Sequence, residues 1–249
     1  MDVLVAVALS SVVVAYNAVA NRWSAFHGWF YVPLNLAFAG AVVAATSIRA
    51  DLSATQLGLS VEVTDFFLPL ALVALFATFA FALALSPLGR LIADERVRGM
   101  YGGTLAAYVL VRIPLGTAVV EEVVFRGVLF ALWRDTGASA VPAALFSSIA
   151  FGLWHIQPTL VGLKMNEPLA SRNKVRAAVI GAVFLTTVAG LGLVFLRTWS
   201  GGLLAPIVLH AGINSVGALA AVTAGRRKRD SQGAGGGHEP VTVSSPGTL

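Results

Sequence analysis

The sequence predicts an all-α, polytopic membrane protein of about seven transmembrane helices. Of its 249 residues, 57% are hydrophobic and only 12% are charged, whereas a soluble domain carries about a quarter charged residues. Apolar runs of about 20 residues, the length that crosses a bilayer as a helix, recur along the whole chain. These two observations together favour a bundle of membrane-spanning helices.

The apolar runs set the order of the spans. We expect helices over residues 3–20, 29–48, 66–85, 113–133, 138–156, 177–196 and 202–222. Pro158 follows the fifth run, where a ring without an N–H is expected to end the helix. Ala18-Val19-Ala20 resembles a signal-peptidase site, but no Lys or Arg precedes the first run. We therefore expect the first run to be a retained helix.

The fourth span depends on one proline. Hydropathy alone would place it at 105–125, which leaves two glutamates at its far end. Proline favours the first turn of a helix, so Pro114 predicts a helix over 113–133 with 105–111 as a lead-in segment. This choice places Glu121, Glu122 and Arg126 within the bilayer.

We expect one membrane domain over residues 1–223, with a motif-bearing core over about 113–220. Residues 224–249 begin with Arg226-Arg227-Lys228-Arg229 and continue as a Gly-rich polar stretch, a composition typical of a disordered tail. Small residues in the later spans favour close helix packing; these are Gly181, Gly190, Gly192, Gly212 and Gly217.

The basic residues separate into two sets of alternate loops. The larger set comprises Arg22, Arg90, Arg96, Arg98, Lys164, Arg172, Lys174, Arg176 and the four basic residues of the tail; the smaller comprises Arg49, Arg134 and Arg197. Because cytoplasmic loops carry the excess of Lys and Arg, the N-terminus is expected outside and the C-terminus in the cytoplasm. The net charge of +5 then reflects topology in a plasma or cytoplasmic membrane and does not indicate nucleic-acid binding.

The chain contains no cysteine. This excludes disulfides, thiolate nucleophiles and thiolate metal sites, and also lipidation of cysteine in this chain. A Ser-His-Asp arrangement is not indicated either, because Ser147 and Ser148 lack a suitable acid partner. Any chemistry is therefore expected from carboxylates, histidines and amides.

Two adjacent carboxylates and an arginine interrupt the fourth apolar run. Ionisable groups at bilayer depth cost several kcal/mol each and mark a functional site with a partner nearby. Glu122 and Arg126 are four residues apart and can pair on one helix face. Glu121 is turned about 100° from Glu122, so it is free to act separately.

Two later spans supply polar groups at compatible depths in the cytoplasmic half of the bilayer. His155 lies near the end of the fifth span, and His210 and Asn214 share one face near the middle of the seventh. A glutamate and a histidine can activate a water that attacks a carbonyl. A second histidine and an asparagine can donate to the oxyanion that develops. The set suits peptide-bond hydrolysis without a covalent intermediate.

Other readings of the same residues stay open at this point. Each motif alone could be a packing device, an interfacial residue or interhelical hydrogen-bonding glue. A proton-coupled transporter could use the carboxylates and histidines as a relay, although no pseudo-symmetric halves are visible. A non-catalytic immunity or scaffold protein could bind its target in the same cavity. Glutamate with two histidines could also bind zinc, although no HExxH is present.

The motifs resemble those of a known family. Glu121-Glu122-x-x-x-Arg126, Phe151-x-x-x-His155 and His210-x-x-x-Asn214, in that order, are similar to the CPBP family, the CAAX protease and bacteriocin-processing, or abortive-infection, intramembrane proteases. This family includes the Ras-converting CAAX prenyl endopeptidase. The resemblance covers about residues 113–220, and spans one to three carry no matching motif.

The resemblance implies a glutamate-type intramembrane endopeptidase that needs no metal or other cofactor. Glu121 is then the general base, with His155 as its partner in activating water. His210 and Asn214 stabilise the oxyanion, and Glu122 and Arg126 form the supporting ion pair. The expected partners are the lipid bilayer and a membrane-anchored protein or peptide substrate, of which a prenylated CAAX protein is one form.

Overall fold

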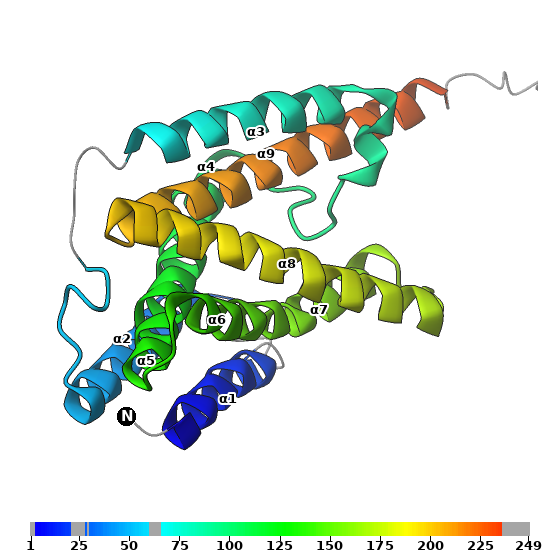
Figure 1. The fold of residues 1–249 in the computed structure, drawn as a ribbon. Coiled ribbons are helices and arrows are strands. Elements are labelled where there is room, and N and C mark those ends of the chain that lie inside the picture. The colour runs from blue at the N-terminus through cyan, green and yellow to red at the C-terminus, as the bar shows by residue number, and fades with distance from the viewer. Residues whose placement is uncertain (1–2, 21–27, 29, 60–65, 236–249) are drawn as a thin grey trace, which may run out of the picture.

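The computed structural model describes residues 3–20, 28, 30–59 and 66–235, with side chains as far as residue 227. These residues form helices joined by turns and loops, without a strand (Figure 1). The predicted all-α class is therefore confirmed. The three N-terminal helices are α1 (Val3–Ala20), α2 (Tyr31–Ala50) and α3 (Phe67–Leu85), followed by the short turn η3 (Pro87–Leu91).

The later helices carry the sequence motifs. A continuous helical segment over 102–135, which we call the motif helix, comprises α4 (Gly102–Ala107), η4 (Tyr108–Arg112), η5 (Pro114–Val119), η6 (Glu122–Leu129) and α5 (Phe130–Asp135). It is followed by α6 (Ala140–Trp154), α7 (Ile156–Asn166), α8 (Arg172–Ser200) and α9 (Leu204–Gly235). Ser171 accepts a hydrogen bond from the Lys174 N–H to begin α8, and Gly201 ends it in the left-handed conformation at φ 74°.

Six helices of the described residues are long and apolar enough to cross a membrane. They comprise α1, α2, α3, the α6–α7 pair, α8 and α9 as far as Arg227. The motif helix is not among them, so the predicted count of seven spans is not confirmed.

The prediction for the fourth span was wrong at its start. The helix begins at Gly102 rather than near residue 113, and Pro114 lies in its interior. A proline inside an α-helix removes one hydrogen bond and crowds the preceding turn. Here Pro114 opens a stretch of wider π-helical turns, η5, in which the backbone pairs over five residues.

Pro158 does not end the fifth helix either. The chain breaks for one residue at His155 and resumes as α7 at Ile156, so Pro158 lies in the first turn of the new helix. A first-turn residue needs no N–H for helix pairing, and proline is tolerated there. His155 is therefore at a junction between two helices rather than at the end of a span.

The C-terminal helix continues beyond the expected start of the tail. The predicted disordered segment begins at residue 224, whereas α9 runs to Gly235. Arg226 donates to the Met100 carbonyl and Arg227 to the Leu85 carbonyl, and these bonds attach this end of α9 to neighbouring segments. Residues 236–249 lie outside the described part of the chain.

The motif helix runs through the middle of the bundle. Its side chains Phe125, Val128 and Leu129 are fully buried and pack with residues of α1, α2 and α6. On the other side, α3 lies along α9, and α8 lies between this pair and α6 (Figure 1). The first helix therefore belongs to the same core as the motifs, although it lies more than 100 residues away in sequence.

Close helix packing falls on only some of the expected glycines. A Cβ on Gly212 would meet Val73 of α3, and one on Gly190 would come within 3.0 Å of the Ser148 Cβ. Gly181, Gly192 and Gly217 have no such neighbour within 4 Å. The tightest crossing involves Gly152 of α6, where a Cβ would contact Thr187 and lie 2.7 Å from the Val183 carbonyl oxygen.

We expect Gly152→Ala to lower the stability of the protein by about 1–3 kcal/mol, because the added methyl group meets backbone that cannot move aside freely. Gly181→Ala is the matched control, with the same chemical change at an open helical position. Thermal unfolding of both variants in the same detergent tests this. Equal melting temperatures would contradict the crossing described above.

Candidate active site

The centre of the site is an ion pair buried within the motif helix. Arg126 Nη1 donates to Glu122 Oε1 at 3.0 Å, and neither side chain is exposed to solvent. The same oxygen lies 2.7 Å from His210 Nδ1 on α9. Because Glu122 Oε1 accepts from arginine as well, Nδ1 is the nitrogen of His210 that carries a hydrogen in this contact.

Aromatic rings enclose this ion pair. The Arg126 guanidinium carbon lies 4.0 Å from the centre of the Phe151 ring, a cation–π arrangement that partly offsets the cost of burying the charge. Phe151 also meets His210 edge-on, with ring centres 6.0 Å apart. One phenylalanine of α6 therefore contacts both partners of Glu122.

Glu121 has different partners from its neighbour, as the helical geometry predicts. Its Oε1 accepts a hydrogen bond from the indole N–H of Trp154 at 2.9 Å. Its Oε2 has no hydrogen-bond partner among the described residues and lies 3.7 Å from His210 Nε2. His210 thus faces one carboxylate with each ring nitrogen.

The structure places the other predicted residues close to the cluster without joining them to the glutamates. His155 Nδ1 lies 2.8 Å from the carbonyl oxygen of Phe151, and its ring meets the Phe151 ring edge-on. Asn214 follows His210 by one turn of α9 and is half-buried. In the residues that the structure describes, no hydrogen bond connects His155 or Asn214 to Glu121 or Glu122.

Sequence reasoning missed Trp154, which contacts Glu121 directly. The signal was present, since Trp154 precedes the motif histidine and a buried indole N–H normally needs an acceptor. Contributions from α1 and α2 were also missed, because single Asn and Tyr residues in those apolar runs match no motif.

A cavity of about 510 Å³ opens beside Glu121. The motif helix and α6 supply Glu121, Thr117 and Trp154, and α1 and α2 supply Asn17, Tyr31 and Asn35. The Tyr31 hydroxyl pairs with Thr117 Oγ1 at 3.0 Å, and Asn35 Nδ2 donates to the Gly116 carbonyl. The first two helices therefore form one wall of the cavity, and α2 is hydrogen-bonded to the motif helix across it.

An apolar groove of about 420 Å³ adjoins this cavity. Met100, Tyr108 and Arg112 line both spaces. The groove also contacts Val32, Ala107 and Val111, and Val111 is exposed on the surface of the helix. The cavity thus adjoins an apolar groove between the start of α2 and the start of the motif helix.

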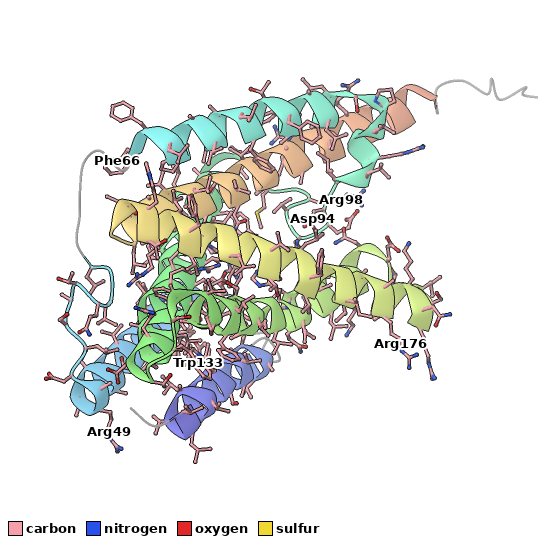
Figure 2. All side chains as sticks on the ribbon, in the orientation of Figure 1. Arg49, Phe66, Asp94, Arg98, Trp133 and Arg176 are labelled. Carbon is pink, nitrogen blue, oxygen red and sulfur yellow. The ribbon has the colours of Figure 1, made fainter. Side chains whose placement is uncertain are left out.

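Two arginines and a small polar network lie at the opening of the cavity. Arg112 and Arg96 line it, and Arg96 pairs with Asp94 at 2.6 Å. Asn166 at the end of α7 donates to Asp94 and accepts from the Glu95 N–H. Figure 2 marks Asp94 and Arg98 in the loop over 92–101, with Arg49 and Arg176 at opposite ends of the bundle.

The side chains of the cluster are poorly suited to bind a metal ion. The described residues contain no group of three His, Asp or Glu side chains close enough to hold a metal ion. Glu122 Oε1 is shared by His210 and by the permanently charged Arg126, whose positive charge opposes a second cation at the same oxygen. The zinc alternative therefore finds no fitting ligand set in these residues.

The fold and the site define a class: an integral membrane protein of helices with a carboxylate, histidine and arginine cluster buried beside a cavity. Residues 103–216 match the family model described as Rce1-like, type II CAAX prenyl endopeptidase Rce1-like. Over these residues the chain is similar to that family of CAAX proteases, in agreement with the resemblance that the motifs predicted. No curated protein and no solved structure matches the chain.

We expect Glu122→Gln to destabilise the protein by about 3–5 kcal/mol, because it leaves the buried Arg126 charge without its partner. Glu121→Gln is the matched control, since it makes the same change one residue away where no arginine is paired. Thermal or denaturant unfolding of the two variants measures the difference. A Glu122→Gln variant as stable as the wild type would show that the ion pair is not needed for folding.

The Asp94 network predicts a dependence on pH. Burial acts to raise the pKa of Asp94, but hydrogen bonds from Arg96 and Asn166 outweigh it and hold the pKa below the ordinary value of 3.8. A carboxylate with a lowered pKa stabilises the folded loop above its ordinary value, and this contribution is lost as the pH falls through the lowered pKa.

Pepsin digestion between about pH 2 and pH 5 tests this contribution. The loop over 92–101 should become cleavable at the acidic end in the wild type. Asp94→Asn should show no such step beyond the intrinsic pH dependence of the protease. The same steep step in both proteins would assign it to another group.

Proposed function

We propose that the protein is an intramembrane endopeptidase that hydrolyses a peptide bond with water activated by Glu121. The observation that carries this proposal is that the two adjacent carboxylates have different surroundings. Each carboxylate has one buried oxygen without a hydrogen-bond partner among the described residues. Glu122 is bound by Arg126 and His210 and does not line the cavity, whereas Glu121 lines it. A buried carboxylate at the wall of a cavity supports the role of general base.

The reaction follows from this arrangement. A water that reaches Glu121 Oε2 from the cavity loses a proton to Oε2 as its oxygen attacks the scissile carbonyl carbon. A tetrahedral oxyanion forms. The carbon–nitrogen bond then breaks, and the proton held by Glu121 passes to the leaving amine. The products are a carboxylic acid and an amine, and no covalent intermediate or external reactant is required.

Stabilisation of the oxyanion is assigned to side chains near the cluster. His210 and Asn214 on α9 are the proposed donors, and His155 is the proposed second partner of the water. For His210 to donate through Nε2 while Nδ1 donates to Glu122, both of its ring nitrogens must carry hydrogen. The proposal requires Asn214 and His155 to turn toward the cavity when substrate binds.

The proposed mechanism needs no metal. Its support is the Arg126 charge beside Glu122 and the ligand set described above, together with a carboxylate that can act as a base alone.

The positive-inside pattern supports a cytoplasmic C-terminus, and the start of α1 and the end of α9 lie at opposite ends of the bundle (Figure 1). On this orientation the site faces the cytoplasmic half of the bilayer.

The two adjoining spaces indicate the kind of substrate. The polar cavity accommodates an extended peptide next to Glu121, and the apolar groove can take a hydrocarbon group of the same molecule. A membrane-anchored peptide, including a prenylated one, would occupy both at once. Arg112 lies where the two spaces meet, and it could contact the polar segment that follows the apolar group.

Glu121→Gln is expected to abolish cleavage, with a loss of at least about 1,000-fold, because the amide cannot accept the proton of water. The test uses purified protein in lipid and a library of membrane-anchored peptides with and without prenyl groups. Gln56→Glu is the control: it makes the reverse exchange of an amide and a carboxylate, at a loop position outside the cavity. Cleavage by Glu121→Gln at the wild-type rate would overturn the assignment.

Chelator treatment of the wild type separates the metal question from the choice of base. Glutamate-dependent cleavage that survives chelation supports the mechanism described above. Loss of cleavage on chelation, restored by zinc, would revive the metal alternative. A folded protein that cleaves no peptide in the library would favour a non-catalytic binding role or transport.

A further inference from the structure

We infer that Trp154 is a positioning residue for Glu121, and that Asn17 of α1 holds Trp154 in place. Neither residue belongs to the three sequence motifs. The contacts themselves are independent of what the protein does. Their effect on turnover rests on the proposed function, and the test below separates the two.

Trp154 fixes which oxygen of Glu121 remains available. The indole has a single N–H and no acceptor, and it is directed at Glu121 Oε1. Oε2 is then left facing His210 Nε2 at 3.7 Å. Without this bond a flexible glutamate can exchange its two oxygens, and either one can turn toward Arg126 instead. The indole therefore sets the direction in which the carboxylate accepts a proton.

The indole is held rigidly. Trp154 is buried, with 5% of its surface exposed. Its ring meets Phe125 edge-on, with centres 5.5 Å apart, and stacks near Tyr16 of α1 at 6.4 Å. Rings from two other helices therefore fix the orientation of the indole, and a donor must be held in this way to preorganise a charged group.

The sequence itself creates the place where α1 attaches. In a helix the carbonyl of Trp154 would pair with the N–H of residue 158, but residue 158 is proline and has none. The Trp154 carbonyl is therefore left without a helical partner at the end of α6. Asn17 Nδ2 donates to it at 2.5 Å, and both side chains are buried.

This pair of bonds connects the first helix to the proposed base. Asn17 holds the backbone of Trp154, and Trp154 holds Glu121. Asn17 lies outside the residues that match the protease family, 103–216. The other ionisable groups around Glu121 are His210 on α9, Glu122 and Arg126 on the same helix, and Tyr31 on α2.

The first measurement is independent of activity. The protein is labelled with ¹⁵N-tryptophan in detergent, and the Trp154 indole signal is identified by its loss in Trp154→Phe. Glu121→Ala should shift that signal and speed its exchange with solvent, because the acceptor is gone. The signal of Trp133 is the internal control, since its buried indole N–H has no partner among the described residues. An unchanged Trp154 signal would overturn the inference.

The second measurement compares variants in the cleavage assay. Trp154→Phe should lower kcat by on the order of 10- to 100-fold, as expected for a misplaced catalytic group. Trp133→Phe makes the same replacement of an indole by a phenyl ring, but the N–H that it removes has no partner among the described residues. This variant should therefore keep near wild-type kcat. Equal losses in the two variants would show that Trp154 acts only through packing.

A double variant tests the role of Asn17. If Asn17 acts through Trp154, then Asn17→Ala should lower kcat alone but add little to Trp154→Phe. If the losses of kcat in the two single variants multiply in the double variant, Asn17 acts independently of Trp154, and its positioning role is overturned. A wild type that cleaves nothing, with the Trp154 signal still responding to Glu121→Ala, would support the contact and reject the proposed function.

Discussion

The bond between Glu122 and Arg126 is the interaction on which the site depends. Two full charges lie inside an apolar bundle with no exposed surface, where desolvation costs several kcal/mol per ion. The cost is offset by pairing, by the Phe151 ring and by His210. Because these partners come from the motif helix, α6 and α9, the ion pair also fixes how the three helices face one another. Glu121 is then presented to the cavity by a scaffold that cannot rotate without exposing buried charge.

The backbone of the motif helix contributes to the same arrangement. Its π-helical turns begin at Tyr108, Pro114 and Glu122, and such turns in proteins often accompany functional sites. The last of them starts directly after Glu121. The wider turns leave backbone groups less regularly paired, and the buried contacts of Phe125, Val128 and Leu129 hold the helix in this form.

Much of this could be predicted from the sequence, and the failures have identifiable causes. Apolar runs located α1, α2, α3 and α8, because a helix that faces lipid must be apolar over most of its surface. Spacing alone predicted the pairing of Glu122 with Arg126 and the separate direction of Glu121. The family assignment followed from the order of the motifs.

The errors arose where one local rule has two outcomes. Pro114 and Pro158 predicted the limits of helices. Pro114 instead lies inside the motif helix, and Pro158 lies in the first turn of a new helix that follows a one-residue break. The break leaves the Trp154 carbonyl without a helical hydrogen bond. The sequence around it does not indicate which distant side chain donates to this carbonyl. Asn17, more than 100 residues earlier, is apparent only when the helices are assembled.

The wall of the cavity formed by α1 and α2 has a consequence for how such a protein can diverge. The groups proposed for bond breaking lie in one stretch of the chain, whereas Asn17, Tyr31 and Asn35 come from another. Changes in the shape and polarity of that wall would alter which peptides fit without touching the hydrolytic groups. In the proposed mechanism, selection of the substrate and its cleavage are therefore physically separable, except at the side-chain amide of Asn17, which lines the wall and also contacts Trp154.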